Sequence, residues 1–247
     1  MIYKKVTIDT DKDLIIHPIG DLHIGSKSCS EEFIIKTLEQ IPKEKEHRII
    51  LMGDLLDVGI KNSIGASVYE QSNFLDDSID YLYNLLKPFA EQIDAIITGN
   101  HEERIYKTVG LDILKIIANK LDVEYCRYSG IITYSLPHKA YNIYFTHGNA
   151  GGGIENALRR CKNMSNKVVA DIYLMGHCHQ NAHTKRIMNY VDSRNQVVTS
   201  MEQFFVLTGH SLKYNESYAE MLGLEISPMG FPEIMLKTKG YKGIQVN

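Results

Sequence analysis

The sequence predicts an α/β protein that folds as a single domain over residues 1–247. Apolar segments of strand length alternate with helical patterns along the first three quarters of the chain, and the segment 49–52 has no polar residue at all. Such a run is typical of a parallel strand that is buried on both faces of its sheet. A chain of 247 residues can bury one large core without dividing, and no repeat or linker-like stretch interrupts this one.

The predicted elements follow the chain in order. Strands are expected at 2–8, 14–20, 48–52, 94–98, 123–127, 131–136, 141–146 and 171–175. Helices are expected at 30–40, 67–86 and 102–120, with one more that carries Arg159 and Arg160. The second of these helices has Phe74 on its apolar stripe. Pro18 falls inside the second strand and predicts a sheet edge or a bulge, because proline has no N–H for the ladder.

The last quarter of the chain has a different character. Hairpin strands are expected at 186–192, 196–208 and 231–246, with few helical signals between them. A motif-bearing core of about 14–180 is therefore followed by C-terminal strands and a tail over 186–247. No feature of the tail predicts its role.

The composition argues against several classes of protein. A net charge of −3 is unlike that of proteins that coat nucleic acid, yet it leaves open an enzyme that acts on phosphate esters, because bound metals supply positive charge. The N-terminus has no long apolar core and no run reaches the length of a membrane span, so we expect no membrane partner. The four scattered cysteines form no C-x-x-C pair, which indicates free thiols and a cytoplasmic location. The oligomeric state has no signal in the sequence.

Five predicted strands end in loops that carry potential metal ligands. These loops present Asp21 and His23, Asp54 and Asp57, Asn100 and His101, His147, and His177 and His179. One such residue alone is more often a turn residue or a helix cap, but five loops in order predict a metal site. Carboxylate and imidazole ligands suit Mn, Fe, Zn, Ni or Co. Two ions about 3.5–4 Å apart that share a carboxylate are the usual device for hydrolysing phosphate esters.

The spacing of the ligand pairs gives an expectation about local geometry. Asp21 and His23, like His177 and His179, are separated by one residue. Alternate residues of an extended segment project to the same side, so we expect the two side chains of each pair to point toward the metal centre from an extended backbone.

The ordered pattern D-x-H, G-D-x-x-D, G-N-H-E, H and G-H-x-H, from Asp21 to His179, resembles the calcineurin-like metallophosphoesterase superfamily. The resemblance implies a four-layer α/β/β/α sandwich, made of two mixed sheets flanked by helices, with a dinuclear centre at one edge. The protein Ser/Thr phosphatases of this superfamily follow the second Asp with Arg-Gly, whereas this chain has Val58-Gly59. The chain therefore looks more like the branch of phosphodiesterases and DNA-repair nucleases.

The resemblance also implies a role for each residue of the motifs. Asp21, His23 and His179 correspond to ligands of one ion, Asn100, His147 and His177 to ligands of the other, and Asp54 to the carboxylate that bridges them. His101 corresponds to the general acid at the leaving-group oxygen. Asp57 corresponds to the carboxylate that orients the His101 ring.

These observations lead to a predicted function with open alternatives. We expect a phosphoesterase that depends on two divalent metal ions, with Mn favoured, and that hydrolyses a phosphodiester or a nucleotide-type phosphate ester. In the mechanism that the resemblance implies, a metal-bridged hydroxide attacks the phosphorus and His101 is the general acid. The alternatives are a phosphomonoesterase, a DNA nuclease and a non-catalytic metal-binding scaffold.

Other residues near the motifs have two interpretations each. Arg104, Arg159 and Arg160 are candidates to bind substrate phosphates, although basic helix faces are often simply solvated. Glu102 follows His101 directly and is expected to brace the loop, since seven other ligands already fill two ions. The tyrosines are spread along the chain, so no surface for stacking a base is predicted.

Overall fold

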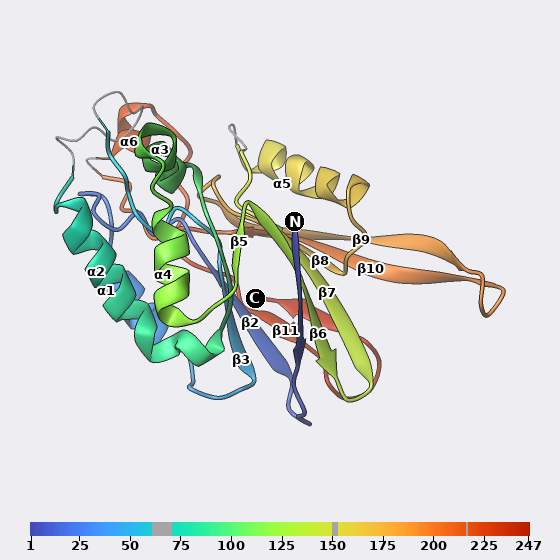
Figure 1. Cartoon of the computed structure of the whole chain (residues 1–247). Helices are drawn as coiled ribbons and strands as arrows, with labels where there is room; N and C mark the ends of the chain where they lie inside the picture. Colours follow the sequence, from blue (N-terminus) through green and yellow to red (C-terminus); the bar gives the residue numbers. More distant parts are fainter. Residues whose placement is uncertain (61–70, 150–152, 216) are drawn as a thin grey trace.

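The apolar strands form two mixed sheets of six strands that face each other, in a computed structural model that describes residues 1–60, 71–149, 153–215 and 217–247 (Figure 1). One sheet has the order β12-β11-β2-β3-β4-β5 and the other the order β1-β6-β7-β8-β10-β9. The strands are β1 (Ile2–Thr7), β2 (Leu14–Ile19), β3 (His47–Leu51), β4 (Ile93–Ile97), β5 (Tyr125–Arg127), β6 (Ser129–Leu136), β7 (Lys139–Thr146), β8 (Ile172–Met175), β9 (Asn181–Asp192), β10 (Val197–Thr208), β11 (Ile234–Leu236) and β12 (Ile244–Val246).

Helices cover the outer face of each sheet. They are α1 (Glu31–Glu39), α2 (Leu75–Leu86), α3 (Asn100–Val109), α4 (Ile113–Leu121), α5 (Ile154–Asn163) and α6 (Tyr218–Met221), with short 3-10 helices at Lys87–Gln92 and Met164–Asn166. One apolar cluster joins α1, α2 and α4 to the outer face of the β2–β3–β4 sheet. A second fills the space between the sheets, and a third lies between α5 and the β7–β8–β10 sheet. The layers are therefore helix, sheet, sheet and helix, and the predicted α/β sandwich is confirmed.

The strands that precede the ligand loops run parallel within each sheet. β2, β3 and β4 pair in parallel in one sheet, and β7 pairs with β8 in parallel in the other. Parallel strands bring their carboxyl ends to one edge. The loops after all five strands consequently meet at the same edge of the sandwich.

Pro18 lies in a strand that has a neighbour on each side. Its pairing with Ile50 of β3 shows no shift in register, so the predicted bulge is absent there. On the other side, β11 pairs with β2 only from Leu14 to Ile16. Pro18 therefore lies beyond the end of β11, where the strand behaves locally as the predicted edge and needs no N–H.

Two predicted helices have different limits in the structure. The predicted helix 102–120 is divided into α3 and α4, because Gly110 takes a left-handed conformation with φ 75° and ends α3. Asp112 then caps α4 by accepting a hydrogen bond from the Lys115 N–H. The predicted helix 67–86 begins only at Leu75, and Phe74 precedes it in an extended conformation with 81% of its surface exposed. Residues 67–70 lie outside the described part of the chain.

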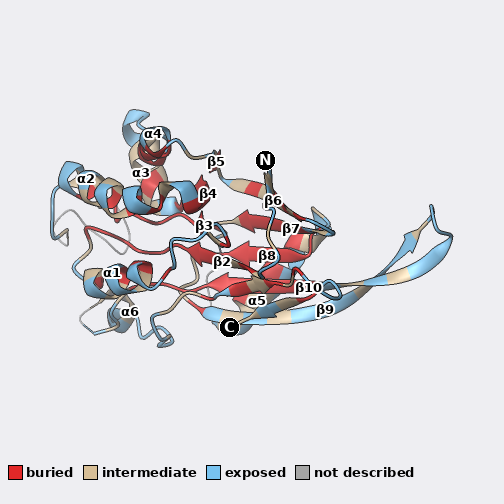
Figure 2. Cartoon of the chain, turned by 90° about the horizontal axis from the view of Figure 1, so that it is seen from below, coloured by how far each residue is buried: buried red, intermediate tan, exposed pale blue. Residues whose placement is uncertain are grey.

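The last quarter of the chain contributes to both sheets. β9 and β10 form a long hairpin that extends beyond the body of the molecule, as Figures 1 and 2 show. The predicted strand 231–246 is instead two short strands, β11 and β12, and β11 pairs with β2. Among the helices of the described residues, none has the length and apolar character needed to cross a membrane.

The buried imidazole of His17 predicts a loss of stability in acid. Burial, together with the neighbouring His47, whose Nδ1 lies 3.0 Å from His17 Nε2, lowers the pKa of His17 to about 4. The folded state therefore binds fewer protons than the unfolded state, so stability is complete above pH 6.5 and falls between pH 6.5 and about 4. For His17→Gln we expect the decrease in the free energy of unfolding from pH 7.5 to pH 5 to be smaller by about 2 kcal/mol.

Urea unfolding at the two pH values measures this difference. His138→Gln is the matched control, because His138 is exposed and its replacement leaves the pH dependence as in the wild type. An unchanged pH dependence in His17→Gln contradicts the prediction.

Candidate metal centre

Sharp backbone turns, and not extended segments, orient the candidate ligands. Asp21, His23, Asp54, His177 and His179 all have positive φ angles, of 49°, 51°, 47°, 68° and 52°. This region is uncommon for residues with a side chain and persists only where the surroundings hold it. The expectation of an extended backbone at D-x-H and H-x-H is therefore wrong, although Asp21 and His23 still converge, and His177 and His179 each join one of two neighbouring groups of donors.

Hydrogen bonds between neighbouring loops hold these turns. Beyond the ends of β2 and β3, the two backbone segments remain hydrogen-bonded to each other. The N–H groups of Asp21 and His23 donate to the carbonyls of Gly53 and Asp54 at 2.9 and 3.0 Å. Gly53 and Gly99 allow the loops to approach, because a Cβ on Gly99 would lie 2.1 Å from Asp54 Oδ1. The glycines of the G-D and G-N-H motifs thus serve close packing of the loops.

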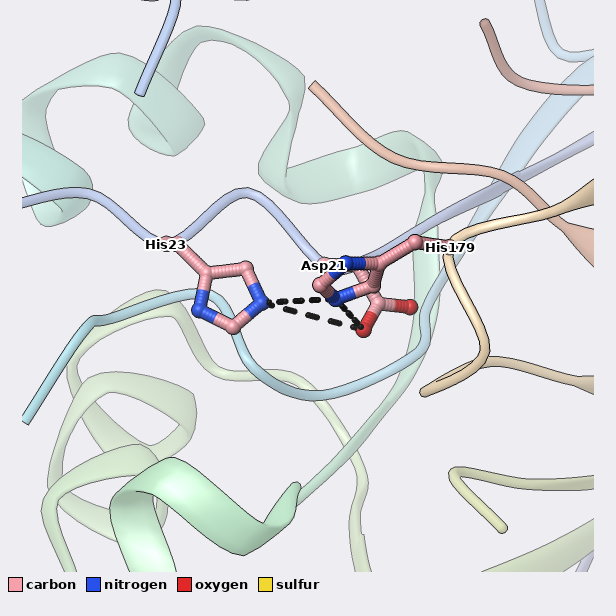
Figure 3. Close-up of side chains that lie close together, drawn as sticks. All are labelled: Asp21, His23 and His179. Atoms are coloured by element: carbon pink, nitrogen blue, oxygen red, sulfur yellow. Dashed lines mark hydrogen bonds and ion pairs between the residues drawn. The ribbon is translucent and has the colours of Figure 1, made fainter. Parts of the chain in front are cut away.

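Asp21, His23 and His179 converge from two different sheets (Figure 3). His23 Nε2 and His179 Nε2 lie 3.1 Å apart, and His179 Nε2 lies 3.3 Å from Asp21 Oδ1. Two of the three side chains are fully buried, and about a third of the His179 side chain is exposed. Their three donor atoms are close enough to bind one cation.

A second group of donors surrounds Asp54. His147 Nε2 lies 3.0 Å from Asp54 Oδ2 and 3.2 Å from Asn100 Oδ1. His177 completes a group in which the donor atoms of Asp54, His147 and His177 all lie within 4.8 Å of one another. The structure therefore brings together all seven residues that the resemblance assigns as metal ligands, in two groups.

The residues present fit divalent metal ions. Asp21 Oδ1 is buried and has no hydrogen-bond partner, and its nearest polar neighbours are the ring nitrogens of His23 and His179. The Nδ1 of His147 lies 2.8 Å from the Met52 carbonyl and donates to it, so Nε2, which faces Asp54, is the atom through which the ring would bind a metal ion after losing its proton. One cation would pair with the orphaned oxygen of Asp21, and a second would pair with Nε2 of His147 and the Asp54 carboxylate.

The electrostatics of the centre also favour the binding of cations. Burial by itself would raise the pKa of Asp54, but the rings of His147 and His101 lower the pKa well below its usual range. Burial likewise lowers the pKa of His147, and the Asp54 carboxylate raises it by more, to about 10. A buried carboxylate therefore retains its charge and requires positive charge beside it.

His101 lies next to the candidate ligands and has its own carboxylate partner. His101 Nδ1 lies 2.5 Å from Asp57 Oδ1, and the other oxygen of Asp57 accepts a hydrogen bond from Gln71 Nε2 at 2.9 Å. Burial lowers the pKa of His101, but the charges of Asp54 and Asp57 raise it above its ordinary value. The neighbouring carboxylates therefore favour the protonated ring, and Nε2 lies on the side of Asp54, 3.9 Å from Oδ2.

Arg104 contacts His101 from one turn further along α3. Its Nη1 and Nη2 lie 3.0 and 3.1 Å from the two ring nitrogens, and Nη1 donates to the Val58 carbonyl at 3.2 Å. The guanidinium is thus placed beside the predicted general acid. Its predicted contact with substrate phosphates stays a prediction.

Arg159 and Arg160 lie apart from the ligand groups. Arg159 donates to Asn156 Oδ1 at 2.7 Å, and Arg160 donates to the Asn149 carbonyl at 3.1 Å. Both line a cavity of about 570 Å³ on the α5 side of the sheet, together with residues on either side of His147. The structure places them near the His147 loop and outside the cluster of donors.

Glu102 connects the loops that follow β3 and β4. Its Oε2 accepts hydrogen bonds from the N–H groups of Gly99 and Asp54 at 2.9 and 3.1 Å, and its Oε1 accepts one from Leu56 at 3.0 Å. Burial and the nearby Asp54 carboxylate raise the pKa of Glu102 to about 7. The expectation that Glu102 braces the loop is confirmed.

His210 is a residue at the centre that the sequence did not indicate. Its ring lies 5.4 Å from the ring of His179, and its Nδ1 accepts a hydrogen bond from the Leu212 N–H at 3.1 Å. The adjoining Ser211 donates to the carbonyls of Asp21 and Leu22, through its N–H at 3.3 Å and its hydroxyl at 3.1 Å. No motif surrounds His210 in the sequence, so only the folded chain reveals its place.

Comparisons with known proteins find distant structural likenesses. No family model matches the chain, and no curated protein sequence matches it. A conserved uncharacterized protein of Streptococcus pneumoniae TIGR4, described as a predicted phosphoesterase, is 12% identical with a TM-score of 0.41, over 95% of this chain and 89% of its own. A protein of unknown function from Aquifex aeolicus is 18% identical with a TM-score of 0.40, over 68% of this chain and 81% of its own. At these scores neither likeness bears on the chemistry of the site.

The bracing role of Glu102 generates a prediction. In Glu102→Gln one acceptor oxygen is replaced by an amide donor, so at least one of the three buried N–H groups loses its partner. We expect the free energy of unfolding to fall by about 1–3 kcal/mol and the protein to retain less metal after gel filtration. Glu103→Gln is the matched control on α3, because Glu103 accepts only from the Tyr128 hydroxyl among the bonds that the structure gives. Equal stability and metal content in the two variants would refute the bracing role.

Proposed function

We propose that the protein is a metal-dependent phosphoester hydrolase of the calcineurin-like metallophosphoesterase superfamily. The observation that carries the proposal is the position of Asp54, which shares one group of donors with His147 and His177 and whose Oδ2 also lies 3.9 Å from Nε2 of His23, a member of the other group. A carboxylate between two sets of imidazole donors is the arrangement that a bridged pair of divalent ions requires. Together with the ordered motifs, it supports two ions, for which Mn is our first choice and Fe, Zn, Ni and Co are the others.

Each residue then has a chemical task. Asp21, His23 and His179 would hold one ion, Asn100, His147 and His177 the other, and Asp54 both. Two bound divalent ions would supply Lewis acidity toward the phosphoryl oxygens and would lower the pKa of a water molecule.

The leaving group needs a proton, and His101 is the residue placed to donate it. Its Nδ1 proton is committed to Asp57, so the proton available for transfer is the one on Nε2. Asp57 keeps the ring oriented and charged until the ester bond breaks, and Arg104 limits the movement of the ring on its other side. His101 and Asp57 are accordingly the catalytic pair that we propose.

The direct test measures hydrolysis of two ester types. Purified protein with added Mn²⁺ is expected to hydrolyse bis-p-nitrophenyl phosphate faster than p-nitrophenyl phosphate, because we propose a phosphodiester substrate. Chelation with EDTA abolishes both rates, and renewed addition of Mn²⁺ restores them. A faster rate with the monoester would indicate a phosphomonoesterase, and cleavage of DNA in a gel assay would indicate a nuclease. Inactivity with every metal and ester would leave only a scaffold.

The role of His101 is tested separately from metal binding. For His101→Ala we expect kcat to fall by about 10²–10⁴-fold, while bound metal, measured by elemental analysis, stays at the wild-type level. His138→Ala is the matched control, since His138 is exposed and belongs to none of the motifs. A parallel loss of metal in His101→Ala would make His101 a ligand and would contradict the assignment.

The proposal includes the organisation and the setting of the chain. We regard 1–247 as one domain, because β11, from the C-terminal part, pairs with β2 in the sheet that carries the Asp21 loop. All four cysteines are free thiols, which supports a reducing cytoplasmic compartment.

A further inference from the structure

Three planar side chains from two separate parts of the chain gather where α3 meets the junction of β5 and β6. The guanidinium carbon of Arg127 lies 4.3 Å from the ring centroid of Tyr106 and 4.8 Å from that of Tyr128. Tyr106 belongs to α3, and Arg127 and Tyr128 lie at the junction of β5 and β6. A guanidinium that contacts two aromatic rings forms a cation–π cluster, which the scattered tyrosines of the sequence did not predict.

This cluster adjoins the candidate metal centre through two hydrogen bonds. The Arg127 carbonyl accepts from the Thr98 N–H at 2.6 Å, and Thr98 precedes Asn100 by two residues. The Tyr128 carbonyl accepts from the Thr146 hydroxyl at 3.0 Å, and Thr146 directly precedes His147. The backbone of the cluster is therefore attached to both loops that carry ligands of the second donor group.

The ring of Tyr128 is held in place and yet remains open to solvent. Its hydroxyl donates to Glu103 Oε1 at 3.0 Å, and Arg127 packs against its ring. Even so, 52% of the Tyr128 surface is exposed. A half-exposed aromatic ring with fixed orientation presents a flat apolar surface at little cost in side-chain entropy, as binding sites for planar groups require.

We propose that Tyr128, supported by Arg127, is the surface on which the nucleobase of a nucleotide-type phosphodiester stacks. The inference rests on the proposed function, which places the phosphate of that ester at the metal centre. A base is joined to its phosphate by a single sugar, and the backbone of Tyr128 and Arg127 is hydrogen-bonded to Thr146, next to His147, and to Thr98, two residues before Asn100. Because every base has a π face, this surface accepts a nucleobase without selecting among bases.

The first experiment compares two esters that have the same leaving group. Thymidine 5′-(p-nitrophenyl phosphate) carries a base, and methyl p-nitrophenyl phosphate does not. For Tyr128→Leu we expect KM for the nucleoside ester to rise about 5- to 150-fold relative to the change for the methyl ester, the range for loss of one stacked base. Tyr128→Phe keeps the ring and is expected to restore KM to the wild-type value.

The matched control is a tyrosine of similar exposure in a distant element. Tyr190 lies on β9 with 46% of its surface exposed, and Tyr190→Leu is expected to leave both KM values unchanged. An equal rise for both esters in Tyr128→Leu would mean that the ring meets the nitrophenyl group, and this outcome overturns the proposal. An unchanged KM for the nucleoside ester overturns it as well.

A binding measurement separates this inference from the proposed function. Adenosine 5′-monophosphate and ribose 5-phosphate share the sugar and the phosphate, and only the first has a base. Calorimetric titration in the presence of Mn²⁺ is expected to show tighter binding of the first by wild-type protein and a loss of this preference in Tyr128→Leu. A protein that hydrolyses methyl p-nitrophenyl phosphate without any preference for the base refutes the stacking site alone. A protein that shows the preference and hydrolyses neither ester refutes the hydrolase alone.

Discussion

Four buried carboxylates at one edge of the sandwich are the constraint on which the rest of the site depends. Asp21, Asp54, Asp57 and Glu102 are each at most 3% exposed, and burial by itself would favour their neutral forms. Backbone N–H groups satisfy Glu102, and His101 and Gln71 satisfy Asp57. Asp21 and Asp54 instead face the ring nitrogens of histidines, and bound cations would balance their negative charge. The arrangement of the loops and the proposed chemistry both follow from balancing this charge.

The part of the site that the sequence predicted consists of residues close to one another along the chain. Each ligand pair follows an apolar run within a few positions, so a short stretch of sequence contains both the strand and the ligands that follow it. Gln71, His210 and Tyr128 could not be found this way, because each approaches the centre from an element whose partner is distant in sequence. Their positions near the centre depend on packing between elements, which a short sequence motif does not specify.

The fold shows the same division between local and long-range information. Hydrophobic runs predicted the strands well, since burial on both faces leaves no room for polar residues. The spacing of Asp21 and His23 predicts an extended segment, whereas both residues lie in turns. The neighbouring loop imposes this conformation, because its carbonyls accept hydrogen bonds from their N–H groups. Similarly, the division between α3 and α4 depends on one left-handed glycine, Gly110. The apolar stripe continues at helical spacing on both sides of it and therefore predicts a single helix.

The bonds that hold the ligand loops together lie within the protein itself. Glu102 joins the loops after β3 and β4, and Asp21 Oδ2 accepts the His177 N–H at 2.9 Å, joining the two sheets. These bonds position the ligand loops relative to one another through the protein's own groups. Affinities of such mixed donor sets follow a common order among divalent metals, so the ion that fills the centre is decided by which metals the surroundings supply. The same polypeptide would accordingly carry different metals in cells of different metal content.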